Sequence, residues 1–509
     1  YGARALNGVI LITTKSGKAS KKGFSVAINS SISIDQLNRK VPLQSSYGQG
    51  FSGRYIDGTA LSWGDRISDR PGGANAYITD PTAAGYAGRF EANNGQTYYR
   101  LLNGTATEPY GGKRSRETYN MYDKLFRTGV TFNNNVSVSS ANEKGNFFMS
   151  FSDTRQKGII VGNSDYRRTT ARLNSTRYLG KYFNVAAKAN YSHVVSNRIQ
   201  RGSNTSGILL GGLRTPADFD ISGFTGTYFD ANGTPFTGRQ RAYRNPYGAR
   251  TNSSYDNPLW ITENIKNTNT VDRFIGSIEL GSDPLPWLNL TWRLGMDHFS
   301  DQRGDFFPTI AASTPGGSYT VSDLRSTQLN SDFIARASFK INDDISGSFL
   351  AGVGANQRIG TTNSTLVTNF VNPLAPPTLG NSSGTGRTPF SSLSVIRNTG
   401  YYYQANFSFY DMVYLNTGGR YEDWSTMNEG FFYPSVDVAF QFSKLLPKND
   451  IFTFGKIRAA WGQVGRAAGP YTDRAVFIDN AVTGDAGWGG AIDQSAYGAG
   501  GSRQSNTAP

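Results

Sequence analysis

Hydrophobic and polar residues alternate along several stretches of the chain. In residues 288–298 (LNLTWRLGMDH), leucine, tryptophan and methionine occupy even positions, while polar or small residues occupy most odd ones. The same period of two recurs at 24–34, 183–193 and 333–340. Because successive side chains of a β-strand point to opposite faces, this pattern predicts strands with one apolar and one polar face.

The connections between these predicted strands fall into two kinds. Short ones lie at 141–145, 178–182, 341–344 and 410–412, whereas segments 35–129, 194–270 and 358–397 are long. A soluble β-sandwich also has alternating strands. Regular switching between short and long connections instead places all short turns at one end, which is typical of a transmembrane antiparallel β-barrel with strands of about 10 residues. We count about 13 such strands between residues 24 and 464 by this pattern.

In a barrel of this kind the apolar face contacts lipid and the polar face lines the interior, since the bilayer centre does not solvate charge. Residues predicted to face lipid are Phe183, Val185, Leu288, Leu290, Trp292, Phe333, Phe407 and Phe409. Residues predicted to line the lumen are Arg293, Arg336, Lys340 and Asn406.

Composition agrees with an all-β membrane protein. The 509 residues include 59 Gly, 28 Tyr and 31 Phe, and 37% of the chain is hydrophobic. Glycine and aromatic residues suit strands and turns. No window contains the roughly 18 consecutive apolar residues that a membrane helix requires. A barrel alternates polar and apolar residues, so it is compatible with the mean hydropathy of −0.45.

The sequence gives little support for catalysis, metal binding, nucleotide binding or nucleic-acid binding. The chain has no Cys and two His, His193 and His298, which are far apart, so we expect no disulfide, metal site, catalytic triad or cofactor. The net charge of +14 comes from scattered residues, which does not favour nucleic-acid binding. Residues 48–53 fit GxGxxG but precede no helix pattern, and 230–233 begin like a calcium loop without its later acidic ligands. Both are interpreted as loops.

The long connections carry aromatic residues that are candidates for substrate contact. Trp63, Tyr98, Tyr99 and Trp260 lie in segments 35–129 and 194–270. Aromatic rings in such loops stack on sugar rings or peptide side chains, or else pack the loop itself. The sequence leaves both interpretations open.

The first residues follow a different pattern. Val9 to Ile12 are four consecutive aliphatic residues, which predicts a strand covered on both faces, unlike the strands after Gly23. Such a strand needs a sheet of its own. It is therefore expected to belong to a separate compact unit.

Phrases in a fixed order resemble the SusC/RagA-type TonB-dependent outer-membrane transporters. They include GARALNGVILITTKSGK (2–18), SSYGQGFSGRY (45–55), SWGDRISDR (62–70), WLNLTWRLGMDHFSD (287–301) and YYYQANFSFYDMVYLNTGGRYEDWS (401–425). The similarity continues to about residue 471 and is weaker in 65–115, 200–255 and 358–397.

The resemblance implies a domain organisation. Residues 1–18 would be the C-terminal end of a plug domain, 19–23 its link to the wall, and 24–509 a barrel that is incomplete at the C-terminus. A complete barrel with a plugged lumen would have about 22 strands. The plug would fill the barrel.

The resemblance also implies a function and partners. The protein is expected in the outer membrane of a Gram-negative bacterium, in contact with its lipid, and is not expected to be an enzyme. It would import an oligosaccharide or oligopeptide, driven by the TonB–ExbB–ExbD motor, with a SusD-like surface lipoprotein as a lid and a dimer of such pairs. An alternative is a barrel component of a larger secretion or surface complex without an import role. A soluble glycan-active β-enzyme is a more distant alternative.

Overall fold

One large antiparallel sheet dominates the computed structural model, which describes residues 23–202, 205–251, 254–382, 384–447 and 453–470 and two short strands beyond them. The sheet has thirteen strands, which confirms the number expected from the sequence. Its strands are β1 (Ser25–Asp35), β6 (Gly129–Asn142), β7 (Gly145–Lys157), β8 (Asp165–Leu179), β9 (Phe183–Arg198), β12 (Lys266–Leu285), β13 (Leu288–Phe307), β14 (Ser318–Lys340), β15 (Ile345–Thr368), β16 (Arg387–Phe409), β17 (Val413–Trp424), β18 (Phe431–Phe440) and β19 (Ile457–Gly462).

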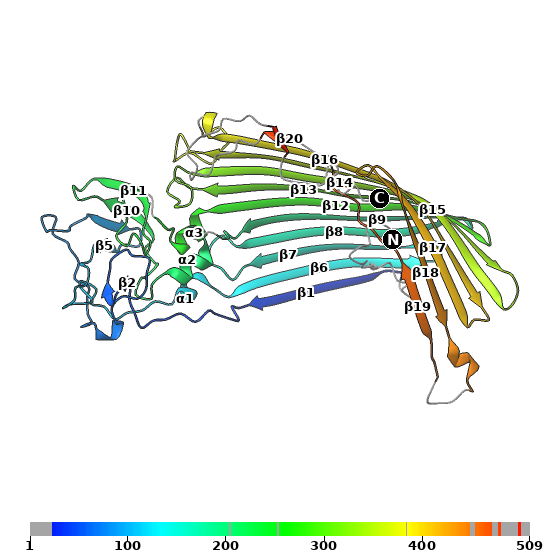
Figure 1. Ribbon diagram of the computed structural model, residues 1–509, viewed down its shortest axis with the longest axis horizontal. Helices are drawn as coiled ribbons and strands as arrows, with labels where there is room; N and C mark the ends of the chain where they lie inside the picture. Colours follow the sequence, from blue (N-terminus) through cyan, green and yellow to red (C-terminus); the bar gives the residue numbers. More distant parts are fainter. Residues whose placement is uncertain are drawn as a thin grey trace.

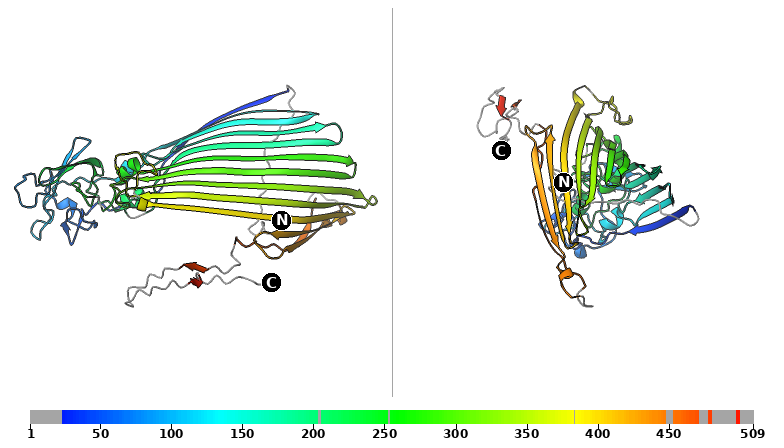
Figure 2. Two further views of the ribbon diagram at one scale, coloured as in Figure 1. Left: turned by 90° about the horizontal axis from the view of Figure 1, so that it is seen from above. Right: turned by 90° about the vertical axis from the view of Figure 1, so that its right-hand side faces the viewer.

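These strands pair in chain order and form a curved, open wall. Figures 1 and 2 show them side by side along the long axis, with the long connections gathered at one end of the early strands. Among the described residues, β1 and β19 are the two edges, so the barrel is incomplete. The expected plug strand at 9–14, and the domain division at residue 18, lie outside the described residues.

No helix in the described part of the chain is long and apolar enough to cross a membrane. The longest α-helices there, α2 (Ile208–Arg214) and α3 (Pro258–Asn264), have 7 residues each.

The register keeps the apolar face continuous from strand to strand. Val185 of β9 lies opposite Leu280 of β12, and Leu280 lies opposite Trp292 of β13. Trp292 in turn opposes Phe333 of β14. Opposed residues of antiparallel strands share a face, so these side chains form one band. Phe183 and Phe333 are 59% and 47% exposed, so no part of the chain that the structure describes covers this band.

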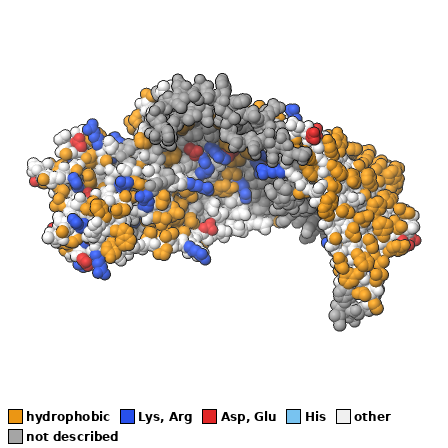
Figure 3. Space-filling view, in the orientation of Figure 1, with side chains coloured by type: hydrophobic (Ala, Val, Ile, Leu, Met, Phe, Trp, Pro, Cys, Tyr) orange, Lys and Arg blue, Asp and Glu red, His pale blue; other side chains and the backbone are white. Residues whose placement is uncertain are grey.

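Charged residues share the other face. In the space-filling view the middle of the molecule is hollowed and Lys and Arg side chains gather there, whereas hydrophobic side chains cover the right-hand end (Figure 3). Arg293 opposes Asp332, and Arg336 opposes Leu350. Lys340 and Asn406 lie opposite Ser346 and Ser348 of β15, on the same side.

Two expectations about strand length were wrong. β14 and β15 have 23 and 24 residues rather than about 10, because they remain paired beyond any bilayer-spanning part. Segment 358–397 is therefore mostly strand. The connection between β15 and β16 comprises only residues 369–386, with the 3₁₀ helix η3 (Gly384–Gly386) at its end.

The other long connections fold into a compact body, which we call the loop unit: residues 36–128, 199–265 and 308–317. Its remaining elements are β2 (Gly50–Phe51), β3 (Arg54–Tyr55), η2 (Ile67–Asp69), β4 (Arg89–Ala92), β5 (Thr97–Tyr99), α1 (Met121–Leu125), β10 (Thr225–Phe229) and β11 (Pro235–Gln240). Outside the loop unit lie η4 (Phe442–Leu445), β20 (Phe477–Asp479) and β21 (Tyr497–Ala499).

A hydrophobic core holds the three helices of the loop unit together. Leu125 of α1 and Ile261 of α3 are fully buried in this core, together with Ile208 of α2 and Ala311 from the β13–β14 connection. Side-chain oxygens cap two of the helices, because Asn120 accepts from the Tyr122 amide and Asn257 from the Leu259 amide. The core explains why long connections can have a fixed structure above the wall.

The two faces predict opposite responses to a new charge. We expect Phe333→Arg, in the middle of the apolar band of β14, to destabilise the inserted barrel by about 2–4 kcal/mol. Ile334→Arg, one residue away on the opposite face, is the matched control and should cost much less. Urea unfolding in lipid vesicles, followed by the gel mobility shift of the folded barrel, measures both. Equal destabilisation by the two substitutions would contradict the assignment of faces.

Candidate functional site

The polar face of the wall carries a ladder of ion pairs. Arg293 of β13 contacts Glu279 of β12 at 2.6 Å and lies opposite Asp332 of β14. Further along the same two strands, Arg273 contacts Asp297 at 2.6 Å. These side chains are about half exposed on the arginine side, so the ladder presents both charges to whatever occupies the interior.

Glycines let large polar side chains lie flat on this face. A Cβ at Gly352 would stand 2.5 Å from the Tyr402 ring, and one at Gly354 would stand 2.6 Å from the Asp332 carboxylate. A Cβ at Gly400 would meet the Arg420 guanidinium at 2.5 Å. Any larger residue would push these groups into the interior. The result is a smooth polar wall from β14 to β17.

A hollow in this wall lies over β16–β18. It has a volume of about 540 Å³, and its lining includes Tyr402, Gln404, Arg420, Tyr433 and Asp437. Arg420 donates through Nε to Glu422 at 2.6 Å and lies over the Tyr402 ring at 5.1 Å. The hollow offers aromatic, cationic and anionic groups within one surface. Tyr402, Gln404 and Arg420 lie within the phrase at 401–425 that carries the family resemblance, but the sequence did not mark any of them as site residues.

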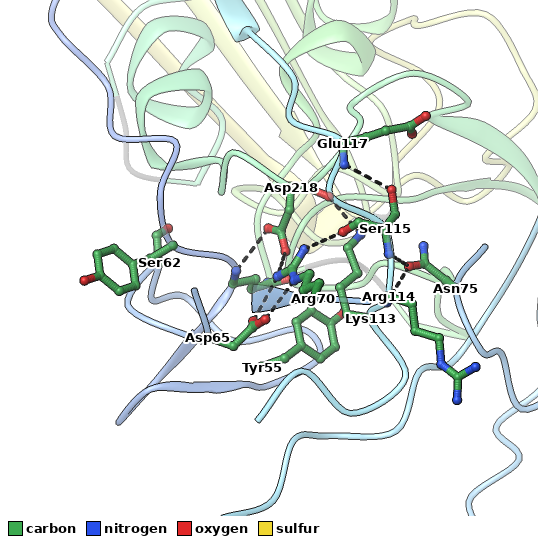
Figure 4. A network of polar contacts seen from close by, with 12 residues as sticks. Tyr55, Ser62, Asp65, Arg70, Asn75, Lys113, Arg114, Ser115, Glu117 and Asp218 are labelled. Atoms are coloured by element: carbon green, nitrogen blue, oxygen red, sulfur yellow. Dashed lines mark hydrogen bonds and ion pairs between the residues drawn. The ribbon is translucent and has the colours of Figure 1, made fainter. Parts of the chain in front are cut away.

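A buried ion cluster joins the two longest connections. Its members are Asp65, Arg70 and Asp218, hereafter the Arg70 cluster. Arg70 donates through Nε and Nη2 to Asp65 at 2.7 and 2.9 Å, and through Nη2 to Asp218 at 2.7 Å. All three side chains are at most 3% exposed. In Figure 4 both carboxylates converge on the guanidinium.

The glycine-rich motif at 48–53 packs directly against this cluster. A Cβ at Gly48 would lie 2.0 Å from Arg70 Nη2 and 2.6 Å from Asp218 Oδ2, so only glycine fits. This close approach lets the Gln49 amide donate to Asp218 at 3.0 Å. The Gly48 amide also donates to the Asp65 carbonyl at 3.0 Å. The motif lies in a connection, as expected, with β2 at its centre, and Gly48 is the glycine that admits the ion cluster.

Lys113 and Asp57 extend the polar interior of the loop unit. Lys113 donates through Nζ to the Asp218 carbonyl at 2.9 Å, and burial lowers the pKa of its ammonium group. Burial raises the pKa of Asp57 to about 6, although the Tyr55 hydroxyl donates to it at 2.9 Å and partly opposes that shift. Asp57 therefore titrates close to neutral pH.

The structure separates the four aromatic candidates. Trp63 is 64% exposed and packs against Tyr47, with 5.5 Å between ring centroids and the ring planes tilted by 46°. Tyr98 is half-buried and lies under the Arg241 guanidinium at 3.7 Å, and Tyr99 packs near Tyr77.

Trp260 has a different environment. It is 1% exposed within the helical core of the loop unit, so the side chain is not accessible to a ligand. The interpretation that it packs the loop itself applies here, because α3 turns the indole inward.

A second hollow at the base of the loop unit was not evident in the sequence. It has a volume of about 400 Å³ and is lined by residues of three distant segments, among them Leu43, Tyr119, Tyr122 and Phe219. Lys40 on its rim contacts Asp123 at 3.8 Å. Because residues 40–45, 118–124 and 215–221 meet only through folding, no local pattern could predict this hollow.

Comparisons with known proteins agree on one class. No protein-family model matches the chain. It is 23% identical to the TonB-dependent receptor P26 of Formosa agariphila over 507 residues, covering 95% of this chain and 43% of the relative. It is 25% identical to the TonB-dependent receptor SusC of Bacteroides thetaiotaomicron over 289 residues, covering 55% and 23%.

A solved structure shares the fold. A chain of the RagAB peptide transporter superposes with a TM-score of 0.69 at 17% identity, covering 96% of this chain and 52% of that chain. The present chain thus spans about half the length of this structural match, and somewhat less than half of the curated relatives that align with 95% of it.

Breaking the Arg70 cluster should loosen the loop unit. Arg70→Met leaves two buried carboxylates without a cation, which we expect to cost about 3–5 kcal/mol. Limited proteolysis of the folded protein should then cut residues 36–128 and 199–265 faster, while the wall stays resistant. Arg89→Met is the control, since the Arg89–Glu91 pair is solvent-exposed and should matter by at most about 1 kcal/mol. Unchanged cleavage of Arg70→Met would refute the role of the cluster.

Asp57 should make the loop unit less stable as pH rises. Its folded-state pKa of about 6 exceeds the ordinary 3.8, so the folded state binds a proton more tightly than the unfolded chain. The free energy of unfolding should therefore fall between about pH 4 and pH 6 and stay lower above it. Asp57→Asn should reduce this pH dependence, as measured by hydrogen exchange of the loop unit at pH 5 and pH 7. An unaltered difference in Asp57→Asn would contradict this assignment.

Proposed function

Because this chain belongs to the SusC/RagA-type TonB-dependent transporters, we propose that it forms wall and loops of an outer-membrane importer for an oligosaccharide or oligopeptide. The observation that carries the proposal is that the two faces of one sheet differ in polarity and that its long connections fold together. One face is apolar and uncovered, the other is polar, and the long connections form a folded unit at one end. A lipid-embedded passage with an external binding region needs these three features.

The proposed transport cycle begins at the loop unit. Substrate binds there, with Trp63, Tyr98 and Tyr99 as contacts, and then passes along the polar wall. Arg293, Arg336, Lys340 and Asn406 line that passage, together with the hollow beside Tyr402. Exposed rings favour flat sugar or side-chain surfaces, while the wall offers alternating charges to polar groups.

Energy and partners follow from the family. A plug closes the lumen, and the TonB–ExbB–ExbD motor opens it at the expense of the proton gradient across the inner membrane. A SusD-like lipoprotein covers the loop unit as a lid, and two such pairs assemble as a dimer in the outer membrane of a Gram-negative bacterium. The protein carries out no covalent chemistry in this scheme, so it is not an enzyme.

Uptake by cells tests this proposal. A strain lacking the full-length protein is supplied with a fluorescent oligosaccharide pool and, separately, a fluorescent peptide pool. Re-expression should restore accumulation of one pool, and a protonophore should abolish it. Trp63→Ala should lower the accumulation several-fold, whereas Phe51→Ala, a 45% exposed residue of the same segment, is the control. Equal accumulation of both pools with and without the protein would refute an import role.

A further inference from the structure

The apolar face of the wall has a hollow that the transport scheme does not use. It lies over β6–β9 and β12, has a volume of about 440 Å³ and includes Phe151, Ala171, Ala189, Tyr191 and Phe274 in its lining. Ala171 and Ala189 are small residues between larger ones, so the surface is indented there. The exposed rings of Phe151 and Tyr191 show that no part of the described chain covers it.

Paired arginines lie on the same face, just beyond the hollow. Arg155 of β7 donates through Nε to Asp153 at 2.6 Å, and Arg167 of β8 donates through Nε to the same carboxylate at 2.9 Å. Thr169 also donates to it at 3.2 Å. Two guanidinium groups share one carboxylate, which leaves a net positive charge.

The arginines, not the carboxylate, face outward. Their side chains are 63% and 57% exposed, against 16% for Asp153. Because each uses its Nε for Asp153, the terminal nitrogens remain available on the outer surface. A guanidinium with free terminal N–H groups suits phosphate, which it can bind through two parallel hydrogen bonds.

The height of these arginines matches a lipid headgroup. Arg155 is four residues beyond Phe151, and Arg167 is four residues beyond Ala171, both towards the loop unit. Four residues span about 13 Å of strand, or about 10 Å along the bilayer normal at a tilt of about 40°. The headgroup layer adds about 5–8 Å to each side of the hydrocarbon core. A step of about 10 Å from the apolar band therefore leads towards this layer, and arginine side chains are long enough for their guanidinium groups to reach it.

Other arginines lie on the same face towards the loop-unit ends of their strands. They are Arg325 of β14 and Arg397 of β16. Arg325 is paired with Asp323, and Arg397 donates to Gln357. The hollow of about 440 Å³ lies beside Arg155 and Arg167, whereas Asp323, the partner of Arg325, lines a different hollow of about 550 Å³.

We propose that the outer face of β7–β9 and β12 binds a phosphate-bearing lipid of the outer leaflet. Its hydrocarbon chain lies in the hollow between Phe151 and Tyr191, and its phosphate contacts Arg155 and Arg167. Apolar and cationic parts in this order match the two ends of an anionic lipid. The site rests on the proposed membrane location of the barrel but is independent of the transported substrate.

Lipid retention by the purified full-length protein tests the site. The detergent-solubilised protein is incubated with lipid A, delipidated by washing and analysed by native mass spectrometry. Arg155→Gln/Arg167→Gln should lower the retained lipid A about tenfold, as expected for losing charge-assisted hydrogen bonds. Ala189→Phe, which fills the hollow, should also lower it. Arg397→Gln, on the same face but away from this hollow, is the control and should retain lipid A like the parent.

The outcomes separate the two proposals. Equal retention by the parent, the double variant and Ala189→Phe would overturn the lipid site, and so would a loss in Arg397→Gln as large as that in the double variant. If the double variant also retained less dephosphorylated lipid A than the parent, its effect would come from a change in the barrel wall and not from lost phosphate contacts, which would overturn the phosphate site. The gel mobility shift of the folded barrel checks every variant. A parent protein that inserts into vesicles but retains no lipid refutes only this inference, whereas a parent that does not insert refutes the membrane location itself.

Discussion

The wall of this protein depends on the pairing of backbone hydrogen-bond groups in a medium without water. Inside a bilayer an unpaired N–H or C=O costs several kcal/mol, so every strand must have a neighbour on both sides. Thirteen strands paired in chain order meet this requirement everywhere between the edges β1 and β19. Once the pairing is set, the period of two fixes every side chain on the lipid or the lumen face, and a register shift of one residue would exchange the faces.

The loop unit is stabilised differently from the wall, because it lies outside the bilayer and has a hydrophobic core of its own. Its core unites three short helices from two connections, and the Arg70 cluster joins residues 65–70 to residue 218. A buried cluster of this kind is weak evidence for net stability, but it requires one arrangement of its partners. Gly48 illustrates this demand, since a single added methyl group would collide with both Arg70 and Asp218. Such precision suits a surface that recognises a substrate or a partner.

The two faces of the wall use charge in different ways. On the lumen face, ion pairs such as Glu279–Arg293 lie beside glycines that keep the wall smooth. On the outer face, Arg155 and Arg167 extend from a shared carboxylate near the loop unit. In the proposed scheme the same residue type thus serves a passage on one side and a lipid boundary on the other. Position along the strand decides between these roles, because water or headgroups must be within reach.

Local periodicity determined much of this protein. The strand number, the turn positions and the separation of Phe333 from Arg336 followed from the sequence, because each depends on residues close along one strand. Strand ends were predicted less well, since pairing with a neighbour extends β14 and β15 beyond what their own pattern requires.

The folded structure of the loop unit could not be predicted from local patterns. The sequence left open whether Trp260 contacts substrate or packs the loop, and the packing of α1, α2 and α3 decided it. Three other sites likewise join residues far apart in sequence: the Arg70 cluster, the hollow beside Tyr402 and the hollow beside Arg155. Tertiary structure decided these sites, because they exist only where folding brings distant segments within a few ångströms of one another.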